Sequence, residues 1–214
     1  MKQVRVRSAR ADDANFLAWL LLTAGRAHVK RGIWEVLLDG PEDQCLSFLK
    51  RLAVTEIPHL FHYSCYLVAE IDDRPVAGLG GYNPTALGYS EVQKAIPGVL
   101  KALGGQVAGQ LMPGESKRIL QCVPADIEGA WIVDSVATLP EFRRKGLVNR
   151  LLEEILKKGR RQGFRLSQIN LYIGNTPALR AYEKQGFRIL DEKRDPYFET
   201  QIGSPGMVRL WRRL

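Results

Sequence analysis

The stretch that decides the fold of this chain lies between Trp131 and Phe187. It begins with WIVDSVAT at 131–138, continues with PEFRRKGLV at 140–148 and ends with NTPALRAYEKQGF at 175–187. The hydrophobic pattern predicts a buried strand, a basic turn, a long helix, a second strand and a short helix. Such a unit is suited to hold phosphate groups, because the start of a helix carries free N–H donors.

Asp134 interrupts the apolar strand predicted at 131–138. A carboxylate inside a buried strand is costly unless it is paired, hydrogen-bonded or open to a cleft. Two interpretations follow: Asp134 is a functional group in a cleft, or it is a structural aspartate that caps a neighbouring loop. Regular alternation would place its side chain on the same face as Val136 and Thr138, with Ser135 on the other face.

The basic turn after this strand has the composition of an anion site. It consists of Arg143, Arg144, Lys145, Gly146, Leu147 and Val148. Glycine lets the backbone approach a ligand closely, and the positive end of the next helix attracts an anion. On the exposed face of that helix we expect pairs of Glu153 with Lys157 and of Glu154 with Lys158. A plain solvated surface is the alternative, because basic residues before a helix are common.

The second strand and the helix after it supply two further candidates. The strand is predicted at 168–173, and Asn175 stands where a helix-capping residue is expected. Gly186 ends the helix. Small neighbours leave room for the Tyr182 hydroxyl to face a cleft, although a buried core tyrosine is the ordinary alternative.

Two motifs in this stretch resemble those of the GNAT superfamily of N-acetyltransferases. Arg143-x-x-Gly146 at the head of a helix is similar to its Q/R-x-x-G-x-G/A acyl-CoA motif. Asn175-x-x-Ala178-x-x-x-Tyr182-x-x-x-Gly186-Phe187 is similar to its N-x-x-A-x-x-x-Y-x-x-x-G-F segment. Val148 departs from the first motif, because the family usually has Gly or Ala there. Its backbone N–H is still available, so we expect cofactor binding to be retained.

The resemblance implies an enzyme that moves an acetyl group from acetyl-CoA directly to an amine, without a metal. It implies that main-chain groups of Val136 and Thr138 hold the pantetheine arm of acetyl-CoA. Asn175 would contact the same arm, and the turn from Arg143 to Val148 would hold the pyrophosphate.

The resemblance also assigns two catalytic roles. Tyr182 would protonate the departing CoA thiolate, and Asp134 would remove a proton from the amine. Aspartate is shorter than the glutamate often found at this strand position, so Asp134 would act through a water molecule.

The other segments predict the remaining elements of a single domain at 1–214 with an insertion at 83–128. Strands are expected near 4–6, 65–71, 75–82, 187–190 and 206–211, and helices at 14–24, about 41–55 and 90–103. We expect Gly25 to end the first helix and Pro97 to interrupt the third. Glycines at 78, 80 and 81 indicate a bulge or a close backbone approach.

The predicted fold class is α+β, in α/β/α layers. A central mixed, mainly antiparallel sheet of six to seven strands would carry helices on both faces. This is also the GNAT-like acyl-CoA N-acyltransferase fold that the resemblance implies.

Charge and cysteine content limit the classes of partner. The formal charge of +8 favours an anionic partner such as cofactor phosphates, an acidic substrate or nucleic acid. A CoA-binding or basic nucleic-acid-binding module without turnover is therefore the alternative function, although no nucleic-acid motif accompanies the basic segments. The three cysteines form no metal or disulfide pattern, which suits a cytoplasmic protein.

The sequence leaves the partners of the enzyme incompletely defined. The apolar run at 16–22 is too short to span a membrane, so no membrane association is expected. The identity of the amine stays open among small amines, antibiotics, amino acids and proteins, and a homodimer is also left open.

Overall fold

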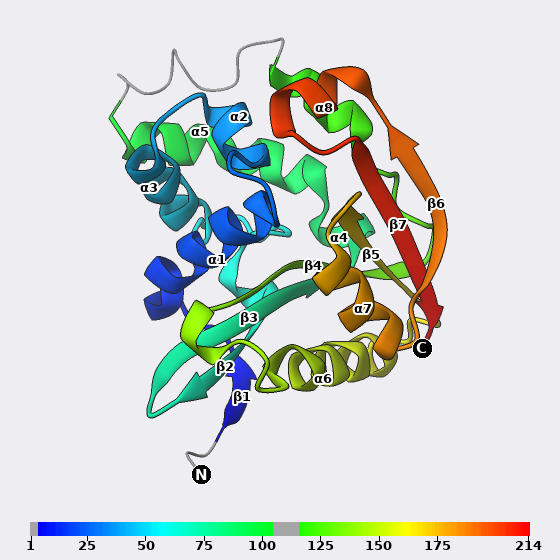
Figure 1. The fold of residues 1–214 in the computed structure, drawn as a ribbon. Coiled ribbons are helices and arrows are strands. Elements are labelled where there is room, and N and C mark those ends of the chain that lie inside the picture. Colours follow the sequence, from blue (N-terminus) through cyan, green and yellow to red (C-terminus); the bar gives the residue numbers. More distant parts are fainter. Residues whose placement is uncertain (1–3, 105–115) are drawn as a thin grey trace.

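The computed structural model describes residues 4–104 and 116–214. Within these residues the chain forms a seven-stranded sheet in the order β1-β2-β3-β4-β5-β7-β6 (Figure 1). The strands are β1 (Arg5–Ser8), β2 (Tyr66–Ile71), β3 (Arg74–Tyr82), β4 (Ala130–Thr138), β5 (Leu166–Tyr172), β6 (Arg188–Arg194) and β7 (Gly206–Arg213). Neighbouring strands are antiparallel except β4 and β5, which are parallel. The predicted mixed, mainly antiparallel sheet is confirmed.

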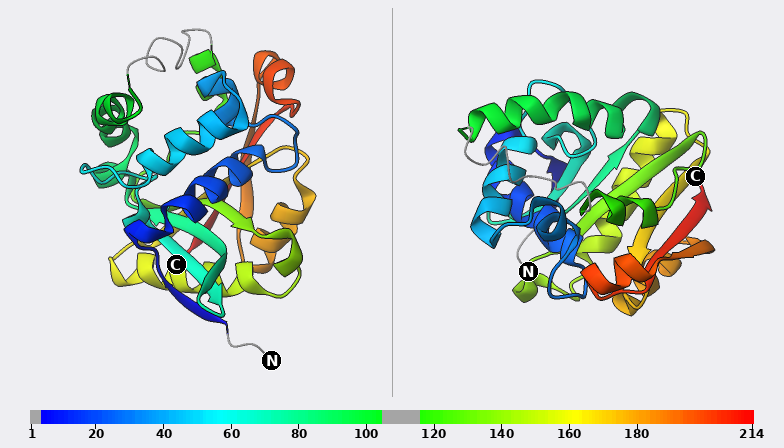
Figure 2. Two further views of the ribbon diagram at one scale, coloured as in Figure 1. Left: turned by 90° about the vertical axis from the view of Figure 1, so that its left-hand side faces the viewer. Right: turned by 90° about the horizontal axis from the view of Figure 1, so that it is seen from above.

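Helices cover both faces of this sheet, as Figures 1 and 2 show for α1 and α6. The α-helices are α1 (Ala14–Arg26), α2 (Ile33–Leu38), α3 (Glu42–Leu52), α4 (Pro84–Leu87), α5 (Tyr89–Ala102), α6 (Leu147–Arg161), α7 (Thr176–Lys184) and α8 (Pro196–Ile202). Short 3-10 helices are η1 (Ala11–Asp13), η2 (Tyr63–Cys65), η3 (Ser116–Cys122) and η4 (Pro140–Phe142). The layered arrangement predicted from the sequence is therefore also confirmed.

The apolar run of β4 reflects burial on both faces of the sheet. Trp131 and Val133 pack in the core cluster that contains α6. Ile132 packs in the other cluster, which contains α1 and α3. A strand between two helical layers loses the usual alternation of apolar and polar residues, and this explains the pattern at 130–133.

Two predictions about the helices, the end of the first at Gly25 and the interruption of the third at Pro97, are wrong. Gly25 lies inside α1, which continues to Arg26. A Cβ at Gly25 would lie 2.6 Å from Trp34 Cδ1, so this glycine permits close packing against α2 and does not end the helix. Helix α5 likewise runs through Pro97. The ring of Pro97 is exposed on the side of α5 that faces solvent, where water can hydrogen-bond the carbonyl left without a partner.

The charge pairs predicted on α6 are also replaced by others. Glu154 pairs with Lys157 at 2.7 Å, one residue closer than the predicted i,i+4 partner. Lys158 Nζ donates to the main-chain oxygen of Ser64 at 3.4 Å. A lysine side chain reaches several acceptors at similar cost, so exposed pairing is weakly determined by spacing.

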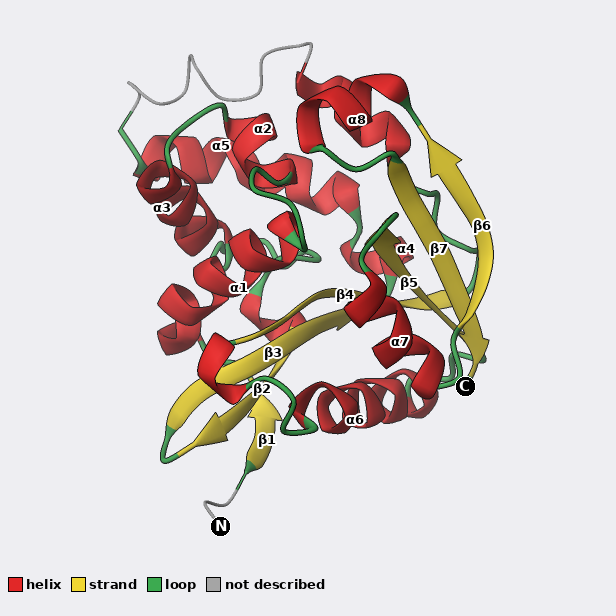
Figure 3. Cartoon of the chain, in the orientation of Figure 1, coloured by secondary structure: helices red, strands yellow, loops and turns green. Residues whose placement is uncertain are grey.

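The segment between the adjacent strands β3 and β4 contains α4, α5 and η3. Figure 3 labels α4 and α5 among the helices. Helix α5 packs against α3 on the α1 side of the sheet. Residues 105–115 of the predicted insertion lie outside the described residues. We propose that 83–128 is an elaboration of a single domain, because its helices join the same core cluster as α1 and α3.

Gly81 marks the close backbone approach predicted for the glycine-rich strand. It pairs with Val133 in the sheet. A Cβ added there would lie 2.4 Å from Ile155 Cγ1 and 2.9 Å from Trp131 Nε1. Helix α6 therefore approaches β3 at a distance that only glycine allows.

The substitution Gly81→Ala is expected to lower the free energy of unfolding by about 1–3 kcal/mol, because the added methyl group overpacks this contact. Urea denaturation measures the loss. The matched control is Gly98→Ala in α5, where no atom lies within 4 Å of the added carbon. The control is expected to gain up to about 1 kcal/mol from helix propensity. Equal stability of the two variants would contradict the prediction.

Candidate active site

The two parallel strands of the sheet separate at the centre of the molecule. Strands β4 and β5 are paired from Ala130 with Leu166 to Val133 with Ile169. Beyond this point β5 stays paired with β7 up to Tyr172, and β4 stays paired with β3. The edge of β4 from residue 134 onward therefore has no neighbouring strand on the β5 side.

A bulge at Ser135 accompanies this separation. Ser135 has a φ of 53°, and Asp134 and Ala137 pair with Gly80 and Gly78. Three steps along β4 thus oppose two steps along β3, which leaves one extra residue in β4. Val136 consequently packs on the α6 side of the sheet, and Ala137 packs on the α1 side.

The predicted alternation along this strand is therefore wrong. The Asp134 side chain lies two residues from Ile132 and therefore on the same, α1-facing side of the sheet, whereas Val136 lies on the α6 side. Thr138, two residues after Val136, lies on the same face as Val136. The physical reason is the extra residue at the bulge, which reverses the two-residue period of the strand.

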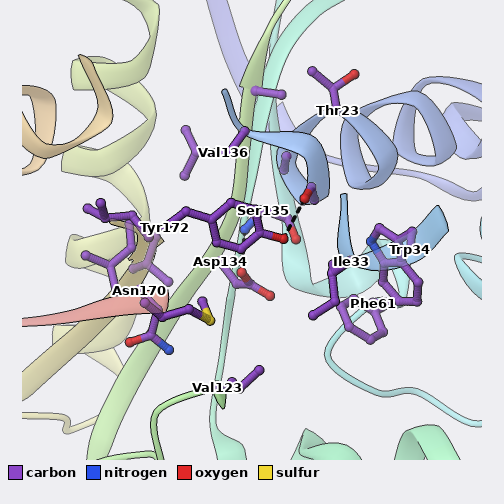
Figure 4. Close-up of a pocket in the computed structure, with 18 of the residues that line it drawn as sticks. Thr23, Ile33, Trp34, Phe61, Val123, Asp134, Ser135, Val136, Asn170 and Tyr172 are labelled. Carbon is purple, nitrogen blue, oxygen red and sulfur yellow. Dashed lines mark hydrogen bonds between the residues drawn. The ribbon is translucent and has the colours of Figure 1, made fainter. Parts of the chain in front are cut away.

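A cavity of about 760 Å³ occupies the space where the strands separate. Its walls come from α1, α2, α3, α5, β4, β5 and α7. Figure 4 shows Asp134 and Tyr172 facing the same space as Ile33, Trp34 and Phe61. One continuous cavity therefore reaches from the α1 side of the sheet to the start of α6.

Asp134 lines this cavity at the bulge. Its Oδ1 accepts a hydrogen bond from the Ser135 N–H at 2.8 Å. The pKa of Asp134 is raised to about 6, chiefly by burial and to a smaller extent by the charge of Asp126, whereas the hydrogen bonds from Ser135 oppose the shift. A carboxyl group with this pKa can exchange a proton near neutral pH.

Tyr182 lines the same cavity from α7. Its side chain is buried, and its ring lies 6.3 Å from the ring of Phe187. Burial raises the pKa of the Tyr182 phenol above its usual value, and the charge of Asp134 adds to this effect. The hydroxyl is therefore protonated at neutral pH and can act as a proton donor.

The basic turn has the backbone shape of an anion site. Arg144 and Gly146 have φ values of 61° and 75°, and α6 begins immediately afterwards. The first turn of α6 contains no acidic residue. Its free N–H groups are therefore not opposed by a local negative charge.

The side chains of this turn are divided between core, cavity and solvent. Arg143 and Val148 line the cavity, whereas Leu147 is buried in the core below α6. Arg144 and Lys145 are exposed. Arg143 Nε donates to the Thr138 main-chain oxygen at 3.2 Å, which ties the turn to the end of β4.

Asn175 is the N-cap of α7, as the sequence predicts. Its Oδ1 accepts the Ala178 N–H at 3.4 Å, and the residue lines the cavity. The side-chain carbonyl is thus used within the helix cap. Its amide NH₂ is the group left to contact a ligand.

Several cavity residues were not predicted from the sequence. Tyr172 donates from its hydroxyl to the Gly25 main-chain oxygen at 2.7 Å and so connects β5 to α1. Asp126 lies near Asp134 but comes from the irregular segment before β4. Only Tyr172, which lies next to the last residue of the strand predicted at 168–173, carried a signal that could have been used.

A parallel pair of strands that separates beside an acid-free helix start, with a proton donor and a proton acceptor in one cavity, is the geometry of an acyl-CoA-dependent acyltransferase. The family model of the Acetyltransferase (GNAT) family matches residues 34–187. The chain therefore belongs to the GNAT acetyltransferase family and is an N-acetyltransferase.

Solved structures share the whole fold at low sequence identity. The crystal structure of an acetyltransferase has a TM-score of 0.70 at 17% identity and covers 98% of both chains. An N-acetyltransferase from Staphylococcus aureus Mu50 has a TM-score of 0.66 at 20% identity, covering 97% of this chain and 100% of that chain. The polyamine N-acetyltransferase of Drosophila melanogaster has a TM-score of 0.55 at 16% identity, covering 99% and 100%. No curated protein sequence is significantly similar to the chain.

Two further features of the described residues concern the requirements of a membrane span and of a metal site. Across residues 4–104 and 116–214, no helix is both long and apolar enough to cross a membrane. The same part of the chain contains no group of three or more His, Cys, Asp or Glu side chains that could hold a metal ion.

The environment of Asp134 predicts a pH-dependent cost to stability. Its pKa is about 6 in the folded protein against an ordinary value of 3.8. Between these values the folded protein binds more protons at this site than the unfolded chain does, so stability falls as the pH rises through the window. At about pH 8, Asp134→Asn is expected to have a higher free energy of unfolding than the wild type. At about pH 4 the two proteins are expected to be equally stable, because Asp134 is then protonated in the wild type.

Urea denaturation at the two pH values measures this difference. The matched control is Asp73→Asn in the exposed turn between β2 and β3, which is expected to behave as the wild type at both. A gain that is larger in acid than in base would show that Asp134 is stabilised in its charged form.

Proposed function

We propose that the enzyme transfers an acetyl group from acetyl-CoA directly to an amine within the cavity described above. The observation that carries the proposal is the single cavity that connects the open edge of β4, the start of α6, Asp134 and Tyr182. Holding both substrates in one space removes the entropic cost of a bimolecular encounter at the reacting atoms. Family membership favours turnover over a module that only binds CoA or nucleic acid.

The cofactor arm is proposed to lie along the open edge of β4. The Leu139 N–H donates to the Val76 oxygen on the β3 side. Alternate residues of a strand turn their main-chain groups to opposite edges, so those of Val136 and Thr138 face the edge that β5 has left. The Thr138 oxygen is already bonded to Arg143, which leaves the Val136 groups and the Thr138 N–H for the pantetheine amides.

The pyrophosphate is proposed to lie at the turn from Arg143 to Val148. The free N–H groups of the first turn of α6 and the side chains of Arg143, Arg144 and Lys145 would supply donors and positive charge. The Val148 side chain packs partly against the core, so its branched carbons do not exclude a phosphate from the backbone. The Asn175 NH₂ would contact the arm from α7.

In the proposed reaction the acceptor ammonium first gives a proton to Asp134 through a water molecule. The neutral amine then attacks the thioester carbonyl, so that a C–N bond forms and the C–S bond breaks. The thiolate takes a proton from Tyr182, and the second proton released by the nitrogen restores the phenol. The net products are the amide, free CoA and one proton transferred to solvent.

Replacing Tyr182 by phenylalanine tests the proton donor. Tyr182→Phe is expected to lower kcat by about 10²–10⁴-fold with little change in acetyl-CoA affinity, because only proton transfer to sulfur is removed. Thiol release from acetyl-CoA with a panel of amines measures the rate. The control is Tyr63→Phe, which changes a partly buried tyrosine that does not line the cavity. An unchanged kcat would exclude Tyr182 as the donor, and binding of acetyl-CoA without turnover of any amine would refute the proposed function.

The glycines at either side of α6 test the phosphate site. Gly146 and Gly163 have φ values of 75° and 89°, and a Cβ at either would meet no atom within 4 Å. Replacing either by alanine is expected to cost about 1–2 kcal/mol of stability from backbone strain. Only Gly146→Ala is expected to weaken CoA binding by about tenfold or more, since it displaces the N–H donors of the proposed site. Isothermal titration with CoA measures this, and equal affinities of the two variants would place the phosphate elsewhere.

We further propose that the enzyme works in the cytoplasm, since its three cysteines are buried free thiols. Homodimer formation stays a prediction.

A further inference from the structure

The half of the cavity on the α1 side is mainly apolar and aromatic. Its wall includes Ile33, Trp34, Leu37, Phe61, Val92 and Val123. The rings of Trp34 and Phe61 lie 4.8 Å apart at 71°, and Figure 4 shows both facing the space beside Asp134. Rigid aromatic side chains of this kind offer contact area to a hydrophobic ligand at little entropic cost.

The charged groups on this side are few and mainly acidic. Among the described lining residues, the acids are Asp126 and Asp134, and they are close enough for the charge of Asp126 to raise the pKa of Asp134. The basic lining residues are His28, Lys117 and Arg143. His28 and Lys117 are exposed, as is Asp126, and Arg143 belongs to the cofactor side. One amino group beside the two carboxylates can be neutralised here. A second ammonium group placed among Trp34, Phe61 and Val92 would lie against apolar side chains without a charged partner.

The same half of the cavity is covered by elements that contact one another. Tyr172 joins β5 to the end of α1 through Gly25, and its ring lies 5.5 Å from that of Phe198 in α8. Helix α2 packs against both α8 and η3. These helices bound the cavity on the α1 side, and its volume of about 760 Å³ is in the range of small-molecule sites.

We propose that the acceptor is a small primary amine with a hydrophobic, ring-bearing body. Its amino group lies beside Asp134 and Asp126, and its ring lies against Trp34 and Phe61. This inference rests on the proposed acetyl transfer and names the class of amine that the site takes.

A comparison of acceptors with the full-length protein and acetyl-CoA tests this inference. The probes are phenethylamine, propylamine, spermidine and a short peptide with a free N-terminus. Phenethylamine is expected to have a kcat/KM at least about tenfold above each of the others, because a matched apolar pocket discriminates by this factor or more. Thiol release from acetyl-CoA gives the rates, and mass spectrometry of the product confirms the amide.

The outcomes separate the inference from the proposed function. Preferred acetylation of spermidine or of the peptide would overturn the inference and leave acetyl transfer intact. Equal kcat/KM values for phenethylamine and propylamine would contradict the proposed contact of the acceptor ring with Trp34 and Phe61. Acetyl-CoA binding without acetylation of any probe would refute the proposed function and the inference with it.

Two matched variants test where the ring of the acceptor lies. Phe61→Leu is expected to raise the KM of phenethylamine about threefold to tenfold, because an aromatic contact is lost, while the KM of acetyl-CoA and that of propylamine change little. The control is Phe164→Leu, which removes a ring that packs on Trp131 and does not line the cavity. Thermal unfolding of both variants reports their folding. An unchanged phenethylamine KM in a folded Phe61→Leu protein would contradict the proposed position of the ring.

Discussion

The separation of β5 from β4 after Val133 is the constraint on which the site depends. Main-chain groups in the middle of a sheet are normally satisfied by both neighbouring strands. Here β5 continues with β7 alone, so one edge of β4 is exposed to the cavity from residue 134 onward. A substrate with amide groups can complete that edge, because it supplies the hydrogen bonds that the missing strand would have made.

The bulge at Ser135 lies where β4 and β5 separate, next to the Asp134 carboxylate. A serine with a φ of 53° adopts a backbone conformation that costs about 1–3 kcal/mol for a residue other than glycine. In return it turns its N–H toward the Asp134 carboxylate and shifts the strand register by one residue. Strain and a partly buried acid thus occur together in the cavity. Both are tolerated because the two core clusters on either side of the sheet hold the strand in place.

The cavity has two halves with different physical character. Toward α6 it offers main-chain donors, an acid-free helix start and the Arg143 side chain, which suit a polar cofactor. Toward α1 it offers aromatic and aliphatic walls with two carboxylates, which suit a hydrophobic amine. Asp134 lies between these halves, where the two substrates would meet. The division follows from the sheet, since the bulged strand turns different residues toward each side.

The sequence by itself determined the order of the central elements and the family. The apolar run at 130–133, the glycine at 146, the cap at Asn175 and the spacing to Tyr182 are local signals, and each corresponds to an observed element. Exposed charge pairs, the end of α1 and the continuity of α5 through Pro97 could not be read, because packing against α2 and solvent exposure decide them. Only the tertiary structure decided the bulge and the lining of the cavity on the α1 side. A single residue with positive φ leaves no mark on a two-residue pattern, and the cavity wall is assembled from segments far apart in the chain.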